Sequence, residues 1–269
     1  MKKSIWIDLL KLLAVFGAVW ALFTFFPILK DAPEIKFSVE SEEKLGDLIV
    51  ENIFKNDPAY KEIKNPALDS AVNIISKRLL EKTGLTDYQY HIRVIDNPQV
   101  NAFTLPGGNI FILSGLIKFS ENPEEVAAVL SHEIGHVEKR HVVSNLLREL
   151  GLALITGALT NGDPVIITEI GKTLLSAKFS RDQEAEADQY GLKLLEDASV
   201  TPQAMASFFR RIEREKGTYD KELEILMSHP NVNSRIKASL EYKTAPTFKS
   251  KEFNLDWKAV KESLAGKEE

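Results

Sequence analysis

Residues 132–136 read His-Glu-Ile-Gly-His, and the rest of the chain is best interpreted outward from this stretch. Successive residues of an α-helix turn by about 100°, so His132 and His136 lie one turn apart and both imidazoles can reach one metal ion. Glu133 borders the same face without being forced to ligate. Two nitrogen ligands beside a carboxylate are typical of a zinc hydrolase site. The alternative is a pair of core histidines satisfied by other polar groups.

The residues before this stretch predict the helix that carries it. Asn122 is a favourable N-cap, and Pro123 suits the first helical position. The acids Glu124 and Glu125 follow where the helix dipole favours negative charge. Apolar residues recur from there to Val137, which gives the helix enough apolar surface to be buried. A histidine pair on a buried helix needs polar partners, and a metal ion supplies them.

The composition of the 269 residues restricts the classes of function. The formal net charge is −5 and the isoelectric point is about 5.7, so nothing favours nucleic acid as a partner. Cysteine is absent, which excludes disulfides, cysteine ligands, a thiol nucleophile and a cysteine-linked lipid anchor. The sequence does not indicate an oligomeric state.

The N-terminal segment predicts a membrane anchor. Lys2 and Lys3 precede an apolar stretch over 12–29, whose 18 residues reach the lower limit for crossing a bilayer. With Lys11, these lysines favour a cytoplasmic N-terminus, which places the remaining chain on the periplasmic side of the inner membrane in a bacterial host. Cleavage of a signal peptide, releasing a soluble exported protein, is one alternative, although no small-x-small site precedes residues 30–33. A buried helix is the other.

The remaining chain is interpreted as one mostly helical domain with a small sheet, an α+β class. Helices are expected over about 41–55, 65–84, 122–137, from 180 onward, over 201–217 and over 257–264, and strands over 88–95 and 109–113. The expected domains are an anchor (1–29), a tether (30–40), the main domain (41–243) and a charged tail (244–269). The apolar, glycine-broken segment 144–178 is a candidate cover for the site.

Two histidines do not complete a catalytic zinc site, which usually has three protein ligands and a position for water. A third histidine six residues after His136 is absent, because Val142 occupies that position and Lys139 replaces the glycine expected before it. His141 is nine residues from His132, about 180° around a continuous helix. We expect His141 to point away from the metal and to contact the surface or a second helix.

An acidic segment further along the chain offers the missing carboxylate. Ser180 and Gln183 fit a capping box that begins a helix. On that helix Glu184 and Asp188 share a face, whereas Glu186 lies about 200° from Glu184. A ligand and an acid that orients a histidine must converge on one side, and Glu184 and Asp188 can do so. The alternative is a solvated acidic face.

In order, these motifs resemble those of the HtpX/BepA/Oma-type membrane-associated zinc metallopeptidases. The resemblance rests on H-E-I-G-H, on S-R-D-Q-E-A-E-A-D over 180–188, on His229-Pro230 with Arg235, and on V-N-A-F-T-L-P-G-G-N-I-F-I over 100–112. It covers about residues 60–240. It implies a helix-dominated, zincin-like (gluzincin) α+β domain with a small β-sheet, here after one N-terminal transmembrane helix, as in a compact single-anchor or exported member.

The resemblance implies a zinc-dependent metalloendopeptidase with one Zn²⁺ per chain. His132, His136 and Glu184 would hold the ion. Glu133 would take the proton of the attacking water and pass it to the leaving amine. Asp188 would hydrogen-bond a ligand histidine and fix its tautomer.

Three further groups have expected roles. His229 would stabilise the tetrahedral intermediate or occupy the open coordination position at rest. Arg181 and Arg235 are expected to form ion pairs that support the acidic helix. A short extended segment before residue 104 is either an ordinary internal strand or an exposed edge that pairs with substrate backbone. Its residues are Asn101, Ala102 and Phe103.

Edge pairing would suit unfolded or extended substrates, and the resemblance implies quality control of membrane or exported proteins. The lipid bilayer would be a second partner, through the N-terminal segment. Two other functions stay open: a latent zinc-binding chaperone or assembly factor, and a non-catalytic membrane-anchored interaction module.

Overall fold

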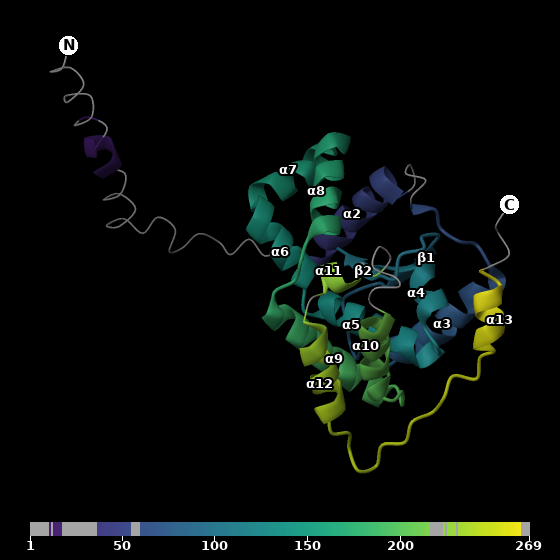
Figure 1. Ribbon diagram of the computed structural model, residues 1–269. Coiled ribbons are helices and arrows are strands. Elements are labelled where there is room, and N and C mark those ends of the chain that lie inside the picture. The colour runs from purple at the N-terminus through teal and green to yellow at the C-terminus, as the bar shows by residue number, and fades with distance from the viewer. Residues whose placement is uncertain are drawn as a thin grey trace. The chain divides into compact units, whose positions relative to one another are not determined.

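The computed structural model contains two units, Met1–Phe37 and Ser38–Glu269. The residues that it describes are 11, 13–17, 37–54, 60–215, 223, 225–229 and 231–264, without the side chains of 53, 54, 176, 226 and 227. The described part of the larger unit is dominated by helices and contains a three-stranded sheet (Figure 1), which confirms the expected α+β class.

The elements of the larger unit follow in chain order. Its described helices are α2 (Val39–Ile49), the π-helix η1 (Val50–Phe54), α3 (Pro66–Leu80), α4 (Ser114–Phe119), α5 (Pro123–Glu138), α6 (His141–Leu150), α7 (Leu152–Asn161), α8 (Pro164–Ser176), α9 (Arg181–Asp197), α10 (Gln203–Glu215), α11 (Ile225–Ser228), α12 (Val232–Glu241) and α13 (Trp257–Glu262). The strands are β1 (His91–Ile95), β2 (Ala102–Leu105) and β3 (Asn109–Leu113). Every helix and strand expected in this unit is present, mostly with shorter bounds. The expected helix end at Gly217 lies outside the described residues.

The sheet has the order β1-β3-β2, so β2 lies at an edge. β1 runs parallel to β3, whereas β2 is antiparallel to it in a hairpin that turns through residues 106–108. All five residues of β3 are buried, as a central strand covered on both faces requires. The extended piece of the sequence is therefore an edge strand and not an internal one.

Helix α5 packs against α9 in the centre of the unit (Figure 1). The Asn122 side chain caps α5 by accepting a hydrogen bond from the Glu125 N–H at 3.0 Å, as expected. Ser180 and Gln183 form the expected capping box of α9. A Cβ atom on Gly135 would lie 2.8 Å from the carbonyl oxygen of Ala187, so only glycine allows α9 to approach α5 this closely.

The helix that carries the histidine pair does not continue through His141. It ends at Glu138, Arg140 has a φ of 54°, and α6 begins at His141. The buried Glu42 of α2 accepts hydrogen bonds from the Arg140 guanidinium, one of them from Nε at 2.7 Å. The expected contact of His141 with a second helix is present, at Glu186 of α9, but the expected direction was wrong because it assumed one continuous helix. His141 is buried, and its ring contacts His136.

The last described residues pack onto the domain rather than leaving it. Phe253, Trp257 and Val260 belong to the main hydrophobic core. The indole of Trp257 donates a hydrogen bond to the Ser120 carbonyl at 3.1 Å. The segment 244–264 is thus part of the larger unit. Residues 265–269 lie outside the described residues.

Most of the expected anchor (1–29) and tether (30–40) lies outside the described residues. Residues 13–17 are helical, and Leu13, Val15 and Phe16 are exposed. Among the described helices, no single one is long and apolar enough to cross a membrane. Helices α6 and α7 together reach that length and apolarity, but they bend by 100° at their junction.

Candidate metal centre

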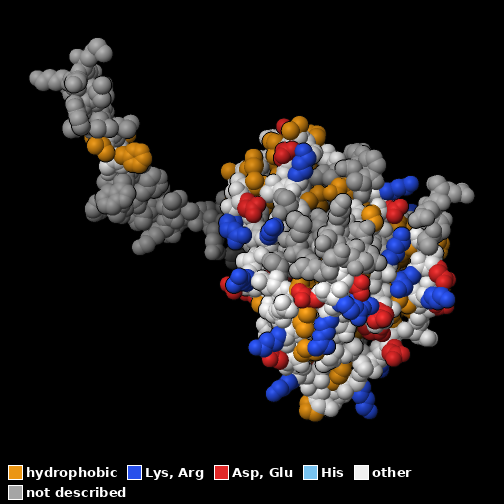
Figure 2. All heavy atoms as spheres, viewed as in Figure 1, with side chains coloured by type: hydrophobic (Ala, Val, Ile, Leu, Met, Phe, Trp, Pro, Cys, Tyr) orange, Lys and Arg blue, Asp and Glu red, His pale blue; other side chains and the backbone are white. Residues whose placement is uncertain are grey.

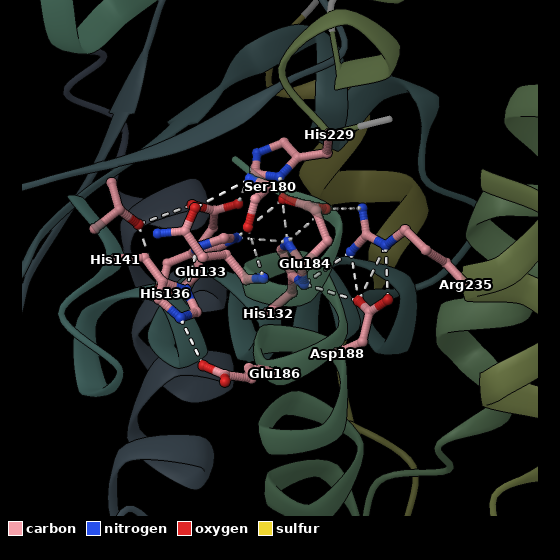
Figure 3. Close-up of polar contacts among 12 residues, drawn as sticks. His132, Glu133, His136, His141, Ser180, Glu184, Glu186, Asp188, His229 and Arg235 are labelled. Atoms are coloured by element: carbon pink, nitrogen blue, oxygen red, sulfur yellow. Dashed lines mark hydrogen bonds and ion pairs between the residues drawn. The ribbon is translucent and has the colours of Figure 1, made fainter. Parts of the chain in front are cut away.

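Four buried side chains bring potential ligand atoms together, all within 4.8 Å of one another. His132 and His136 come from α5, and Glu184 comes from the first turn of α9. His229 directly follows α11, and its N–H donates to the Ile225 carbonyl at 2.9 Å. Their side chains point toward one another (Figure 3). The structure thus brings together the three expected ligands and adds His229 as a fourth donor.

The separations between the donors fit a tetrahedral zinc ion. Ligands at 2.0–2.1 Å from a tetrahedral zinc lie about 3.4 Å from one another. The Nε2 atom of His132 lies 3.0 Å from His136 Nε2 and 3.3 Å from His229 Nδ1. The Oε1 atom of Glu184 lies 3.4 Å from His136 Nε2 and 2.9 Å from His229 Nδ1. Three imidazole nitrogens and one carboxylate oxygen are also a ligand set that zinc prefers.

Two oxygen atoms beside these donors have no hydrogen-bond partner among the described residues. They are Oε2 of Glu184 and Oε1 of Glu133, and both are buried. Glu184 Oε2 has an ion-pair contact with Arg235 Nη1, whereas the unbonded Glu133 Oε1 costs free energy that a cation or a bound water would recover. This observation supports a metal ion and a polar reactant at this place.

The environment of Glu184 and of His136 favours the ligand-competent protonation state of each. Burial alone would raise the pKa of Glu184, but His229, His136 and His132 hold that pKa well below its usual value. Burial lowers the pKa of His136 well below the value of a free imidazole. The carboxylate is therefore charged and the imidazole neutral, as metal ligation requires.

Asp188 lies where the sequence places it, beside His132. Its Oδ1 is 2.9 Å from His132 Nδ1, and it also accepts hydrogen bonds from Arg235 Nε and Nη2. Burial alone would raise the pKa of Asp188, but the Arg235 guanidinium and the hydrogen bond with His132 lower it to about 2. Nη2 of Arg235 also lies 2.8 Å from His132 Nδ1. Ligation through His132 Nε2 would leave the proton on Nδ1, which would then donate to the Asp188 carboxylate and not accept from Arg235.

The two arginines have different positions. Arg235 is buried between Asp188 and Glu184, with Nη1 3.3 Å from Glu184 Oε2, and so forms the expected ion pairs with the acidic helix. Arg181 is exposed at the first position of α9, and its side chain makes no ion pair within the described part of the chain. The expected support by Arg181 is therefore not seen.

The carboxylate of Glu133 lies beside the four donor side chains, next to strand β2 of the sheet. Its Oε2 accepts a hydrogen bond from Thr104 Oγ1 at 2.8 Å, and its Oε1 lies 3.6 Å from His229 Nε2. The sequence did not single out Thr104, although it lies in the strand next to the predicted substrate residues. Its hydroxyl fixes one oxygen of Glu133 and leaves the other directed to the site.

A cavity of about 600 Å³ opens beside the centre. Phe103 and Thr104 of β2 line one side together with the preceding Asn101, and His229 also lines the cavity. Residues of α6, of α8 and of the loop after it form another wall, so the segment 144–178 does border the site. Phe179 of that loop stacks on His136, with ring centroids 3.8 Å apart. Sequence reasoning missed Phe179, because an aromatic residue in a loop carries no periodic signal.

β2 borders this cavity through Phe103 and Thr104. The N–H of Leu113 in β3 donates a hydrogen bond to the carbonyl of Asn101 at 3.0 Å. Antiparallel ladders alternate, so the backbone groups of Ala102 are directed away from β3. The N–H of Ala102 donates to the Asn101 side-chain oxygen at 3.0 Å. Asn101 and Ala102 are buried, and Phe103 is half-buried and stacks on Phe111.

Two histidines from one helix, a glutamate from a second helix and a glutamate beside the ligands define the site of a metallopeptidase. The model of peptidase family M48 matches residues 66–243. The chain belongs to this family.

Two curated relatives with which the chain shares sequence are named as proteases. The chain is 29% identical to the beta-barrel assembly-enhancing protease of Yersinia pestis over 233 residues, which are 80% of this chain and 47% of that protein. It is 30% identical to the mitochondrial metalloendopeptidase OMA1 of Schizosaccharomyces pombe over 198 residues, 68% of this chain and 58% of that protein. The chain thus spans about half the length of these relatives.

Proposed function

We propose that the protein is a zinc-dependent metalloendopeptidase. The observation that carries this proposal is the convergence of His132, His136 and Glu184 with a buried, partly unsatisfied Glu133. Zinc binding alone does not need Glu133, whereas hydrolysis needs a base beside the ligands. This argues against the alternatives of a latent zinc-binding chaperone and of a non-catalytic interaction module.

Glu133 is placed for proton transfer. A zinc ion held by the three ligands supplies Lewis acidity, which acidifies water and polarises a carbonyl group. The free Oε1 of Glu133 would accept the proton of the attacking water and donate it to the leaving amine. Thr104 would hold the other oxygen and so keep the carboxylate in one orientation.

We propose that β2 binds the substrate as an added strand. Phe103 and Thr104 of this edge strand, and Asn101 just before it, line the cavity that leads to the donors. A substrate backbone would take over the Ala102 N–H from the Asn101 side chain, and Phe103 would contact a substrate side chain. Pairing through the backbone tolerates many sequences and needs an extended chain. Unfolded or extended proteins are therefore the favoured substrates.

The surroundings agree with work near a membrane. The exposed apolar residues Leu13, Val15 and Phe16 belong to the proposed single anchor. Figure 2 shows further hydrophobic side chains at the end of the unit formed by α7 and α8, where Leu154 and Val165 are exposed. We infer a periplasmic-side location and a role in quality control of membrane or exported proteins, with export as a soluble protein as the alternative.

Glu133→Gln is the decisive test. The variant should bind one zinc per chain like the wild type but lose casein cleavage by a factor of about 100 or more, because the amide cannot accept a proton. Zinc content by elemental analysis and cleavage with a chelator control are measured side by side. Glu213→Gln, an exposed change on α10, is the matched control. Normal cleavage by Glu133→Gln would refute the proposal, as would zinc-free wild-type protein.

A further inference from the structure

His136 has a polar partner on the side facing away from the proposed metal. Its Nδ1 lies 3.0 Å from Nδ1 of His141, and Nε2 of His141 lies 3.1 Å from Oε2 of Glu186 (Figure 3). His141 is buried, with 3% of its surface exposed, whereas the Glu186 side chain is 59% exposed. The contacts form one chain from Glu186 on α9, through His141 on α6, to His136 on α5.

Only one assignment of protons to neutral imidazoles satisfies every contact when His136 ligates through Nε2. Nε2 of His136 must then offer its lone pair, so the proton is on Nδ1 and is donated to His141. Nδ1 of His141 accepts that bond, so its own proton is on Nε2. That proton is donated to the Glu186 carboxylate. Each step fixes the next tautomer.

The two expected ligand histidines have different hydrogen-bond partners at Nδ1. Asp188 accepts directly from His132, whereas no carboxylate among the described residues lies within hydrogen-bond distance of His136 Nδ1. The break after α5 turns the chain so that His141 fills this place. Arg140, at the break, is held by Glu42 of α2, which anchors the turn independently of the metal ligands.

We propose that His141 is the positioning residue for the ligand His136, and that Glu186 fixes the tautomer of His141. This inference rests on the proposed metallopeptidase function, because it concerns the metal-binding form of His136. It assigns a role to Glu186, which lies on the opposite side of its helix from Glu184. The competing explanation is that packing alone orients His136, through the ring of Phe179.

Two substitutions of His141 separate hydrogen bonding from packing. His141→Leu removes the acceptor and keeps bulk, whereas the side-chain oxygen of His141→Asn can replace the Nδ1 acceptor. We expect His141→Leu to weaken zinc binding by about 10- to 100-fold. His141→Asn should restore most of that loss. The dissociation constant is measured on the full chain by competition with a chromophoric zinc chelator.

Substitution of Glu186 tests the outer step. Glu186→Gln should weaken zinc binding less than His141→Leu does, since this side chain is mostly exposed. When it is combined with His141→Asn, Glu186→Gln should not weaken zinc binding further, because His141→Asn already removes the hydrogen bond to Glu186. Asp182→Asn is the matched control, since it removes the same charge from an exposed side chain one turn earlier on α9.

Nitrogen NMR of the imidazoles supplies a second readout. The chain has only five histidines, so their ring signals can be assigned by substitution. In the zinc-loaded wild type, His136 should carry its proton on Nδ1 and His141 on Nε2. In Glu186→Gln, whose side-chain oxygen is a weaker acceptor than a carboxylate, the His141 tautomer protonated on Nδ1 should become detectable as a minor form.

The outcomes distinguish this inference from the proposed function. If the wild type binds no zinc, the proposed function and this inference both fail. If the wild type binds zinc and His141→Leu binds it equally tightly, only the inference is overturned. If His141→Leu does not fold, Glu186→Gln decides the question. Wild-type zinc affinity together with an unchanged His141 tautomer in Glu186→Gln would overturn the role of Glu186 and of the chain of contacts.

Discussion

His229 gives the candidate centre four protein donors, one more than a catalytic zinc site uses. Its Nδ1 is as close to Glu184 and His132 as the other donors are to one another. A fourth protein ligand occupies the position that water needs. Of the two roles expected from the sequence, this geometry favours occupation of the open position at rest.

At the residue scale, we predict that His229→Ala opens this position. Cleavage of a short unstructured peptide should rise several-fold, because water no longer competes with the imidazole. Zinc binding should weaken by about tenfold, since three ligands remain. Initial rates and zinc affinity are measured together. A fall in kcat with unchanged KM would instead show a role in the transition state.

At the element scale, the approach of α9 to α5 decides whether a carboxylate reaches the histidines. Gly135 lies between the two ligand histidines and faces Ala187, which lies between Glu184 and Asp188 on its own helix. The contact therefore sets the separation of the two halves of the centre. Ala187 is fully buried at this contact, whereas Ala185 on the same helix is exposed.

We predict that Gly135→Ala pushes the two helices apart. Overpacking at this contact should lower the free energy of unfolding by about 1–3 kcal/mol and weaken zinc binding. Gly157→Ala on α7 is the control, because its Cβ would meet nothing within 4 Å. That change should stabilise the helix by up to about 1 kcal/mol. Denaturant unfolding measures the free energy of unfolding of both variants, and chelator competition measures their zinc affinity. Equal values for the two variants would contradict the packing argument.

At the scale of the whole molecule, the C-terminal segment stabilises the domain without contacting the centre. Trp257 packs in the core shared by α3 and α5, far along the chain from any proposed ligand. Its hydrogen bond to Ser120 joins the last described helix to the loop before α5. The segment that the sequence separated as a charged tail therefore affects stability and not chemistry.

Trp257→Ala should lower the free energy of unfolding by about 3–5 kcal/mol, because a large buried side chain is lost. The zinc content of the folded protein should stay at the wild-type level. Leu85→Ala, at a fully exposed position, should change neither quantity. An unchanged unfolding midpoint in Trp257→Ala would show that 244–264 is a dispensable tail.

Much of the fold could be predicted because its signals are local. The caps Asn122 and Ser180 determine where α5 and α9 begin, and helical spacing places His132 with His136 and Glu184 with Asp188. These relations depend only on residues within one or two turns. For the same reason, the strands within 88–95 and over 109–113 could be expected from local sequence.

The sequence by itself determined that His132 and His136 share one helix face with Glu133 beside it, and that Glu184 and Asp188 share a face of the second helix, because an α-helix converts spacing directly into direction. Only the tertiary structure decided which residues of different helices, strands and loops contact one another. It brought Thr104 to Glu133 and Phe179 to His136, and it placed β2 at the sheet edge. It also turned His141 back toward His136, because Glu42, 98 residues earlier, holds Arg140 at the helix break. Contacts of that range have no local pattern, so they become visible only when the chain is folded.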